Sequence, residues 1–275
     1  MTTHYGQSSS AWDALAAGYD EFVTGSHMDL AEEALERAGV RPGMHLLDVA
    51  CGSGALSIPA ARLGVQVTAV DISAAMMNRL TARAALEGLP NLHGRVMDGH
   101  ALDFADGTFD ICGSQFGVVL FPDLARGLSE MARVTRPGGR VVVVAFGPPH
   151  TVEFFGYFLG ALRAVVPGFT DPPMDPPPLP FQLADPATFR SALTTAGLTD
   201  IRIEAVTGQV EYDSGQHMWD WVTNSNPIGA ALVADLATEQ RASVREMLDG
   251  LLRQRSGAVH GAVLRHAVYV GLATR

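Results

Sequence analysis

The sequence is poor in cysteine and in charged side chains, and it has no apolar run as long as the roughly 20 residues of a membrane span. Cys51 and Cys112 are its two cysteines among 275 residues, which predicts a reduced, cytoplasmic protein rather than a disulfide scaffold. Charged residues make up 17% and the formal net charge is −10, which disfavours nucleic acid and anionic membranes as partners. Residues 1–10 contain neither a basic nor an apolar segment, so we expect no secretory signal. Hydrophobic residues make up 47%, enough for a substantial core.

Apolar segments rich in β-branched residues alternate along the chain with segments of helical periodicity. Strands are predicted at 45–50, 66–70, 111–114 and 139–146, and helices at 73–87 and 124–134. The valine run at 141–144 is typical of a strand buried on both faces of a parallel sheet. We expect Ser73 to cap the first of these helices, and Gly138 and Gly139 to end the second. This rhythm predicts a doubly wound, Rossmann-like α/β domain.

The last third of the chain has a different pattern. Residues 200–212 alternate in polarity and predict a strand, and residues 267–273 predict another. The segment between them, 214–255, is mostly helical in pattern and is interrupted at Pro227. An antiparallel final pair added to a parallel sheet explains this order.

Prolines are concentrated in one segment, since ten of the 16 lie between Pro148 and Pro186. Such a segment cannot be a central strand or one continuous helix. Two interpretations stay open: a surface connection, or a stiff lid over a pocket at the carboxyl edge of the sheet.

A glycine loop follows the first predicted strand and is the most informative segment. Gly52 and Gly54 allow the backbone to turn tightly and to approach a ligand closely. Asp71 ends the next strand, where a carboxylate suits the two hydroxyls of a ribose. Ser57 replaces the third glycine of a dinucleotide fingerprint, and Asp48 precedes the loop, so an ammonium-bearing nucleoside fits better than a pyrophosphate.

Five motifs occur in order, at 48–54 (Asp-Val-Ala-Cys-Gly-Ser-Gly), 70–73, 97–102, 109–111 and 133–140. Together they resemble class I S-adenosylmethionine-dependent methyltransferases, in the small-molecule branch similar to the ubiquinone and menaquinone C-methyltransferases. The resemblance implies a seven-stranded sheet of order 3-2-1-4-5-7-6, with the last strand antiparallel and helical cap insertions. It covers residues 10–146, which would form the cofactor-binding core of a single domain, 1–275. From composition and pattern we expect a proline-rich lid or linker at 147–186 and a helical insertion at 213–260 that caps the substrate pocket.

The resemblance also implies S-adenosylmethionine as cofactor, S-adenosylhomocysteine as product, and no metal. Asp71 would hold the ribose, Ile72 and Met76 would pack on adenine, and Asp98 would accept a hydrogen bond from its exocyclic amine. The other expected cofactor contacts are Tyr19, Asp48, Ala50, Cys51, Gly52, Gly54, Gly99, His100, Gln115 and Phe116.

The expected reaction is in-line transfer of the methyl group to a small, hydrophobic or aromatic acceptor, as in secondary metabolism or quinone-like chemistry. His150 and Glu153 are candidate bases because they follow the fifth strand, although such residues more often have exposed or structural roles. Candidate acceptor contacts are Tyr157, Phe181, Trp219 and Trp221.

Several alternatives stay open at the level of sequence. The glycine loop with Asp71 also suits a nicotinamide-dependent oxidoreductase. A non-catalytic S-adenosylmethionine-binding module, or a cofactor-assisted reaction without net methylation, is equally compatible with the motifs. Ser-Gln-Phe-Gly at 114–117 stands where base-modifying methyltransferases carry Asn/Asp-Pro-Pro-Tyr, which again disfavours nucleic acid. An exposed apolar cap would offer a surface for a homodimer.

Overall fold

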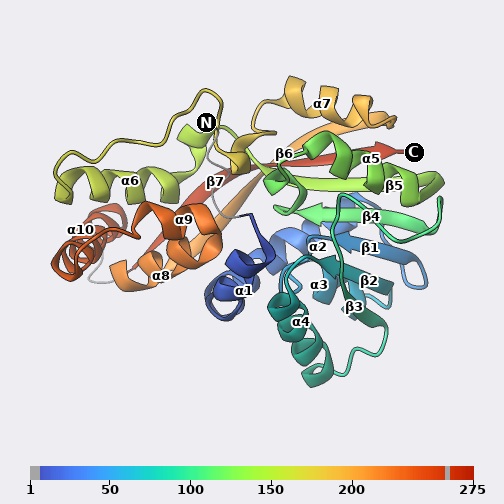
Figure 1. Ribbon diagram of the computed structural model, residues 1–275, viewed down its shortest axis with the longest axis horizontal. Helices are drawn as coiled ribbons and strands as arrows, with labels where there is room; N and C mark the ends of the chain where they lie inside the picture. Colours follow the sequence, from blue (N-terminus) through green and yellow to red (C-terminus); the bar gives the residue numbers. More distant parts are fainter. Residues whose placement is uncertain (1–6, 258–260) are drawn as a thin grey trace.

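A seven-stranded mixed sheet crosses the computed structural model, which describes residues 7–257 and 261–275 (Figure 1). The strand order is β3-β2-β1-β4-β5-β7-β6, and β7 runs antiparallel to both of its neighbours. The predicted order and the antiparallel last strand are therefore confirmed. The strands are β1 (His45–Val49), β2 (Gln66–Asp71), β3 (Leu92–Val96), β4 (Phe109–Gln115), β5 (Thr135–Phe146), β6 (Thr199–Tyr212) and β7 (Ala262–Thr274).

Helices cover both faces of the sheet and extend beyond one end of it (Figure 1). The α-helices are α1 (Ser9–Gly18), α2 (Met28–Arg37), α3 (Ser57–Arg62), α4 (Ala74–Leu86), α5 (Leu124–Val134), α6 (Glu153–Val165), α7 (Pro186–Thr195), α8 (Gly215–Ser225), α9 (Pro227–Leu232) and α10 (Thr238–Ser256). The short helices are η1 (Tyr19–Thr24), η2 (Gly25–His27), η3 (Val118–Leu120), η4 (Pro149–Thr151) and η5 (Leu179–Phe181). None of these described helices has the length and apolar character needed to span a membrane.

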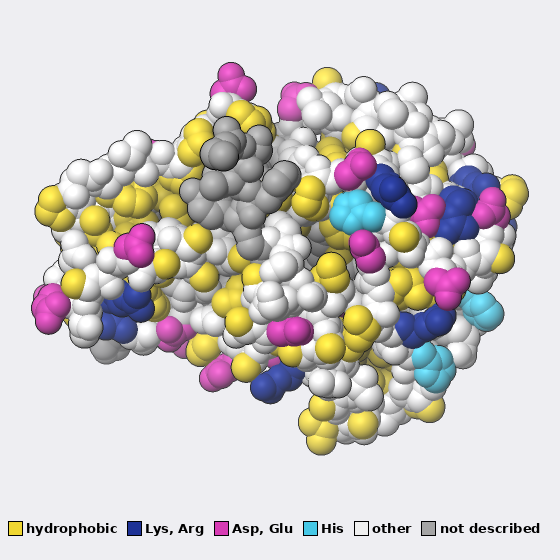
Figure 2. Space-filling model, viewed as in Figure 1, with side chains coloured by type: hydrophobic (Ala, Val, Ile, Leu, Met, Phe, Trp, Pro, Cys, Tyr) yellow, Lys and Arg dark blue, Asp and Glu magenta, His cyan; other side chains and the backbone are white. Residues whose placement is uncertain are grey.

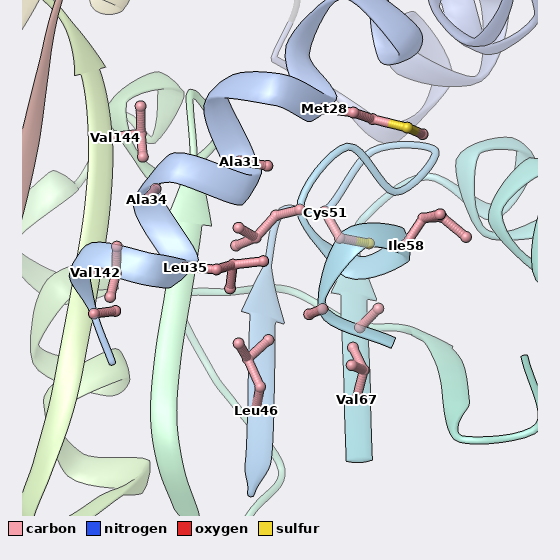
Figure 3. Packing of buried hydrophobic residues seen from close by; sticks show 14 of the residues in the cluster. Met28, Ala31, Ala34, Leu35, Leu46, Cys51, Ile58, Val67, Val142 and Val144 are labelled. Atoms are coloured by element: carbon pink, nitrogen blue, oxygen red, sulfur yellow. The ribbon is translucent and has the colours of Figure 1, made fainter. Parts of the chain in front are cut away.

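The valine run in β5 shows why the sheet needs helices on both faces. Val142 and Val144 belong to a core with Ala34 and Leu35 of α2 (Figure 3). Val141 and Val143, on the opposite face, pack instead in a core with α5 and α7. All four valines are at most 2% exposed. Burying each of these side chains stabilises the fold by about 1.5–3 kcal/mol, so β5 contributes strongly to the stability of the sheet.

The ends of the predicted helices are partly confirmed. Ser73 caps α4, since its hydroxyl accepts a hydrogen bond from the backbone N–H of Met76 at 3.1 Å. The prediction that Gly138 and Gly139 end the second helix is wrong, because α5 ends at Val134 and β5 begins at the next residue. Gly139 lies in an irregularity of β5, where a Cβ atom would approach a backbone oxygen of β4 to 2.7 Å.

Two strands differ from the sequence pattern. β7 begins five residues before the predicted start at 267, because its first half pairs with β6 as far as Tyr212 opposite Ala262. No apolar pattern in the sequence marks β3, because four of its five residues are exposed at the edge of the sheet.

Four helices, α6, α8, α9 and α10, form a cap beyond one end of the sheet (Figure 1). With the ends of β6 and β7, these helices enclose a separate hydrophobic core that contains Phe158, Tyr212 and Trp221. On one face of the molecule, hydrophobic side chains gather over this part, and charged side chains are frequent over the sheet (Figure 2). The proline-rich segment 147–186 contains α6, so part of it is regular helix. The predicted insertion at 213–260 corresponds to α8–α10, with residues 258–260 outside the described chain.

Candidate functional site

A cavity of about 340 Å³ opens between the sheet and the cap, a size typical of small-molecule sites. Its walls come from segments far apart in sequence: the N-terminal helices, the loops after β1, β2 and β4, and the cap. Twelve residues predicted from the sequence line it: Tyr19, Ala50, Gly52, Asp71, Ile72, Met76, Asp98, Gly99, His100, Gln115, Phe116 and Phe181. The structure therefore brings most of the predicted cofactor residues to one place.

The glycine loop after β1 has the backbone conformation for which the sequence selects glycine. Gly52 has φ +55°, and a Cβ atom there would lie 3.2 Å from the ring of Tyr19. Gly54 has φ +105° and no room for a Cβ atom, which would lie 2.4 Å from Leu80. Gly54 and the buried Cys51 do not line the cavity; they support the loop from behind.

Asp71 joins the end of β2 to the glycine loop. Its carboxylate accepts hydrogen bonds from the backbone N–H groups of Gly52 and Ser73, both at 2.9 Å. The side chain is 8% exposed, and this burial raises its pKa despite the two hydrogen bonds. Because Asp71 lines the cavity, its carboxylate is positioned to accept hydrogen bonds from a ligand as well.

Asp48 lies behind the loop and does not line the cavity. One carboxylate oxygen accepts a hydrogen bond from the hydroxyl of Ser57 at 2.6 Å, and the other has no hydrogen-bond partner among the described residues. Burial raises the pKa of Asp48 to about 7, and the charge of nearby Asp71 acts in the same direction. Two buried carboxyl groups beneath one loop favour a cationic ligand above it.

Among the described residues, the cavity wall contains no lysine or arginine that could face a pyrophosphate. The sequence has no lysine, and no arginine belongs to the described lining residues. The acidic lining residues are Asp71 and Asp98. This charge distribution suits a nucleoside that carries a sulfonium and an ammonium group, and it disfavours a dinucleotide.

Asp98 and Gly99 form a turn that is fixed by hydrogen bonds to His100 and by close packing against Phe121. Asp98 accepts hydrogen bonds from the backbone N–H of His100 at 2.9 Å and from its ring Nδ1 at 2.8 Å. Partial burial acts to raise the pKa of Asp98, but these hydrogen bonds outweigh it and the pKa is lowered. A Cβ atom at Gly99 would lie 2.5 Å from the ring of Phe121, so glycine is required for this packing.

The end of β4 separates two halves of the cavity. Phe116 has φ +55° and Ala50 has φ +54°, an uncommon conformation for residues other than glycine and one that concentrates at functional sites. Gly117 allows the two segments to meet, since a Cβ atom there would lie 2.6 Å from the carbonyl oxygen of Ala50. The Phe116 ring stacks on that of Phe146 at 4.3 Å between centroids. We call the side of Asp71 and Asp98 the cofactor half, and the opposite side the acceptor half.

The acceptor half is almost entirely apolar. Its apolar walls are Val23, Phe146, Phe154, Phe155, Phe158, Phe181, Val222, Ile228 and Leu232, and its polar residues include His27, Ser225 and Asn226. Phe181 is the predicted acceptor contact that lines it; Tyr157, Trp219 and Trp221 do not. Trp221 lies behind the wall, 4.8 Å from Phe154 between ring centroids.

The structure does not bring the candidate bases to the cavity. Glu153 accepts hydrogen bonds from the guanidinium of Arg255 at 3.0 Å and from the backbone N–H of Arg265 at 2.7 Å. His150 is exposed in η4. Sequence reasoning missed His27, which lines the acceptor half, because no motif marks it. Its signal is tertiary: it is a buried histidine whose Nε2 has no hydrogen-bond partner among the described residues.

The sheet order, the glycine loop and the acidic residue after β2 are together the architecture of class I methyltransferases, as the motifs predicted. A family model described as "Methyltransferase domain" matches residues 47–143. Demethylmenaquinone methyltransferase of Mycolicibacterium vanbaalenii is 31% identical over 214 residues, which cover 73% of this chain and 90% of that protein. The chain therefore belongs to the methyltransferase family that this model describes.

Other relatives match a shorter part of the chain. An uncharacterized protein of Mycobacterium tuberculosis is 35% identical over 190 residues, which cover 68% of this chain and 66% of its own length, slightly under two thirds. Nocamycin O-methyltransferase of Saccharothrix syringae is 36% identical over 155 residues, 55% of each chain. The solved phosphoethanolamine N-methyltransferase 2 of Haemonchus contortus, in complex with S-adenosyl-L-methionine, has a TM-score of 0.54 and 18% identity over 90% of this chain and 52% of that one. This last likeness is one of fold alone.

Proposed function

We propose that this protein transfers a methyl group from S-adenosylmethionine to a small, uncharged, hydrophobic or aromatic acceptor. The observation that carries the proposal is one cavity with two different halves: acidic and glycine-lined on one side, aromatic on the other. The relatives named as methyltransferases support the reaction class, and the nocamycin relative supports a role in secondary metabolism. We include a cytoplasmic location in the proposal, supported by two free, buried cysteines.

The cofactor half offers a partner for each part of the cofactor. Asp71 would hold the ribose hydroxyls, Ile72 and Met76 would pack on adenine, and Asp98 would accept from its exocyclic amine. Tyr19, which lies against Gly52, would cover the methionine end. When bound, the cofactor supplies a methyl group attached to a positively charged sulfur. This sulfur is a good leaving group because it becomes a neutral thioether when the methyl group is transferred.

The protein's own contribution is alignment and exclusion of water. The aromatic walls of the acceptor half hold an apolar molecule against the end of β4, next to the cofactor half. Because the sequence has no lysine and no arginine lines that half in the described part of the chain, a phosphate or carboxylate on the acceptor would be buried without a counter-charge. The acceptor is therefore expected to be neutral.

The first test is isothermal titration calorimetry of the full chain with S-adenosylmethionine, S-adenosylhomocysteine and NADH. We expect micromolar binding of the first two and none of NADH. Neutral phenols and quinols are then incubated with isotopically labelled S-adenosylmethionine, and methylated products are detected by mass spectrometry. Absence of cofactor binding by folded protein would refute the proposal, and NADH binding would favour the oxidoreductase. Acceptor conversion without release of S-adenosylhomocysteine would favour a reaction without net methylation.

A further inference from the structure

His27 ends η2 and lines the acceptor half. Its ring lies 4.9 Å from that of Phe116 and 5.8 Å from that of Trp221, between centroids. The residue is 5% exposed, and its Nε2 atom is buried without a hydrogen-bond partner among the described residues. A buried polar nitrogen left in this state costs stability, so its retention in an aromatic wall calls for a ligand.

The other polar side chains near this wall are already hydrogen-bonded or carry no basic atom. Ser225 donates its hydroxyl to the carbonyl oxygen of Val222 at 2.8 Å. The side-chain oxygen of Asn226 accepts from two backbone N–H groups that begin α9, at 2.9 and 3.2 Å. Gln115 donates its Nε2 to the carbonyl oxygen of His27 at 2.9 Å, which leaves its Oε1 atom free, and an amide oxygen is no base.

Burial, reinforced by the neighbouring His266, lowers the pKa of His27 to about 3. The imidazole is therefore neutral near pH 7, and with its proton on Nδ1 its Nε2 atom can accept a hydrogen bond. Nε2 of His27 and Oε1 of Gln115, both buried and without a hydrogen-bond partner among the described residues, would then be acceptors. They fit a molecule that presents a hydrogen-bond donor.

We propose that His27 is a catalytic residue that binds a phenolic hydroxyl of the methyl acceptor and takes its proton during transfer. This inference rests on the proposed function. The O–H bond breaks, its proton goes to Nε2 of His27, and its electron pair stays on oxygen. The same oxygen forms the new bond to the methyl carbon, while the electron pair of the broken carbon–sulfur bond stays on sulfur.

A second pocket adjoins His27. His27 lines this pocket as well as the main cavity, and Asp29, Glu33 and His266 are among its other walls. An imidazolium formed at His27 would border the same pocket as two carboxylates and a second imidazole. His266 is buried with both ring nitrogens unpartnered among the described residues, and Gly208 opposite it leaves space for the ring.

The test uses two flat aromatic molecules, 2-naphthol and naphthalene, which differ by one hydroxyl group. Their affinities for the full chain are measured by fluorescence titration with saturating S-adenosylhomocysteine and again without it. We expect wild type to bind 2-naphthol at least about tenfold more tightly than naphthalene, the effect of one well-formed hydrogen bond in a buried site. Excited 2-naphthol is a strong acid, so contact with a base should also produce naphtholate emission from the bound molecule.

His27→Phe should remove both the preference for 2-naphthol and the naphtholate emission. His27→Gln, which keeps a hydrogen-bond acceptor but no base, should keep part of the preference and lose the emission. The matched control is His93→Phe, at an exposed position of β3 outside the cavity, and it should behave as wild type. Calorimetry with S-adenosylhomocysteine on every variant shows whether the cofactor half is intact.

The outcomes separate this inference from the proposed function. Retained preference and emission in His27→Phe would overturn the role of His27, as would failure of wild type to prefer 2-naphthol. If wild type does not bind S-adenosylhomocysteine, the proposed function itself is refuted. If His27→Phe does not fold, emission lost in folded His27→Gln supports the base role, and emission retained there overturns it.

Discussion

Replacement of Asp71 by alanine should weaken cofactor binding more than any other single change in the cofactor half. The carboxylate lines the cavity, is 8% exposed, and is fixed by the backbone N–H groups of Gly52 and Ser73. A hydrogen bond to a buried charged acceptor contributes about 1.5–3 kcal/mol. Because 1.4 kcal/mol is a tenfold change in Kd, we expect affinity for S-adenosylhomocysteine to fall by a factor of about 10 to 150.

The same substitution also affects folding. It leaves the N–H groups of Gly52 and Ser73 without their acceptor, at a cost of about 1–3 kcal/mol in the free energy of unfolding. The matched control is Asp110→Ala. Asp110 likewise accepts from a backbone N–H, that of His45 at 2.8 Å, but it lies at the start of β4 and outside the cavity. Asp110→Ala should therefore lose stability without losing cofactor affinity.

Isothermal titration calorimetry gives the affinities, and urea denaturation gives the stabilities. Folded Asp71→Ala with a Kd within a factor of two of the wild-type value would refute the ribose assignment. Equal losses of affinity in Asp71→Ala and Asp110→Ala would show that the effect comes from general loosening of the sheet. Asp71→Asn, which keeps one oxygen acceptor, should fall between wild type and Asp71→Ala.

Three further predictions follow from single contacts. Gly117→Ala places a Cβ atom 2.6 Å from the carbonyl oxygen of Ala50, which should lower the free energy of unfolding in urea by about 1–3 kcal/mol. The pKa of His27 is about 3 in the folded protein against 6.5 for the ordinary side chain, so its stabilising contribution is present above pH 6.5 and is lost as the pH falls. Between pH 7 and pH 5, wild type should lose about 2 kcal/mol of stability relative to His27→Gln in urea titrations. Glu153→Gln should leave methyl-transfer turnover unchanged while costing about 1 kcal/mol or less of stability, because its ion pair is partly exposed.

Each of these predictions has a control or a contradicting result. Gly156 is exposed on α6 with nothing within 4 Å of an added Cβ atom. Gly156→Ala should therefore raise the free energy of unfolding, whereas Gly117→Ala should lower it. Parallel loss of stability in wild type and His27→Gln on acidification would show that His27 titrates normally in the folded state. A large fall in turnover for a stable Glu153→Gln would return Glu153 to the list of catalytic candidates.

The cofactor half could be predicted from sequence because each of its parts is local. In a parallel sheet, ligand contacts come from the few residues that follow each strand, so a motif such as 48–54 carries both its structure and its position. Asp71 and Asp98 follow neighbouring strands, and the sheet order places both at the same cavity. The main errors of element prediction arose where local pattern is weak, at the exposed edge strand β3 and at the direct junction of α5 with β5.

Most of the acceptor half was decided by tertiary structure, although the sequence had singled out Phe181. His27, Phe146, Phe154 and Phe181 lie on separate elements, and only the packing of the cap against the sheet brings them together. Helical spacing could show that the aromatic residues of α6 are buried, but not which of them face a cavity. For the same reason the sequence favoured His150 and Glu153 by their place after β5, whereas the structure turns Glu153 toward Arg255 and buries His27 in the cavity wall. Hydrophobic periodicity determines that a face is buried, and only the three-dimensional arrangement determines what it is buried against.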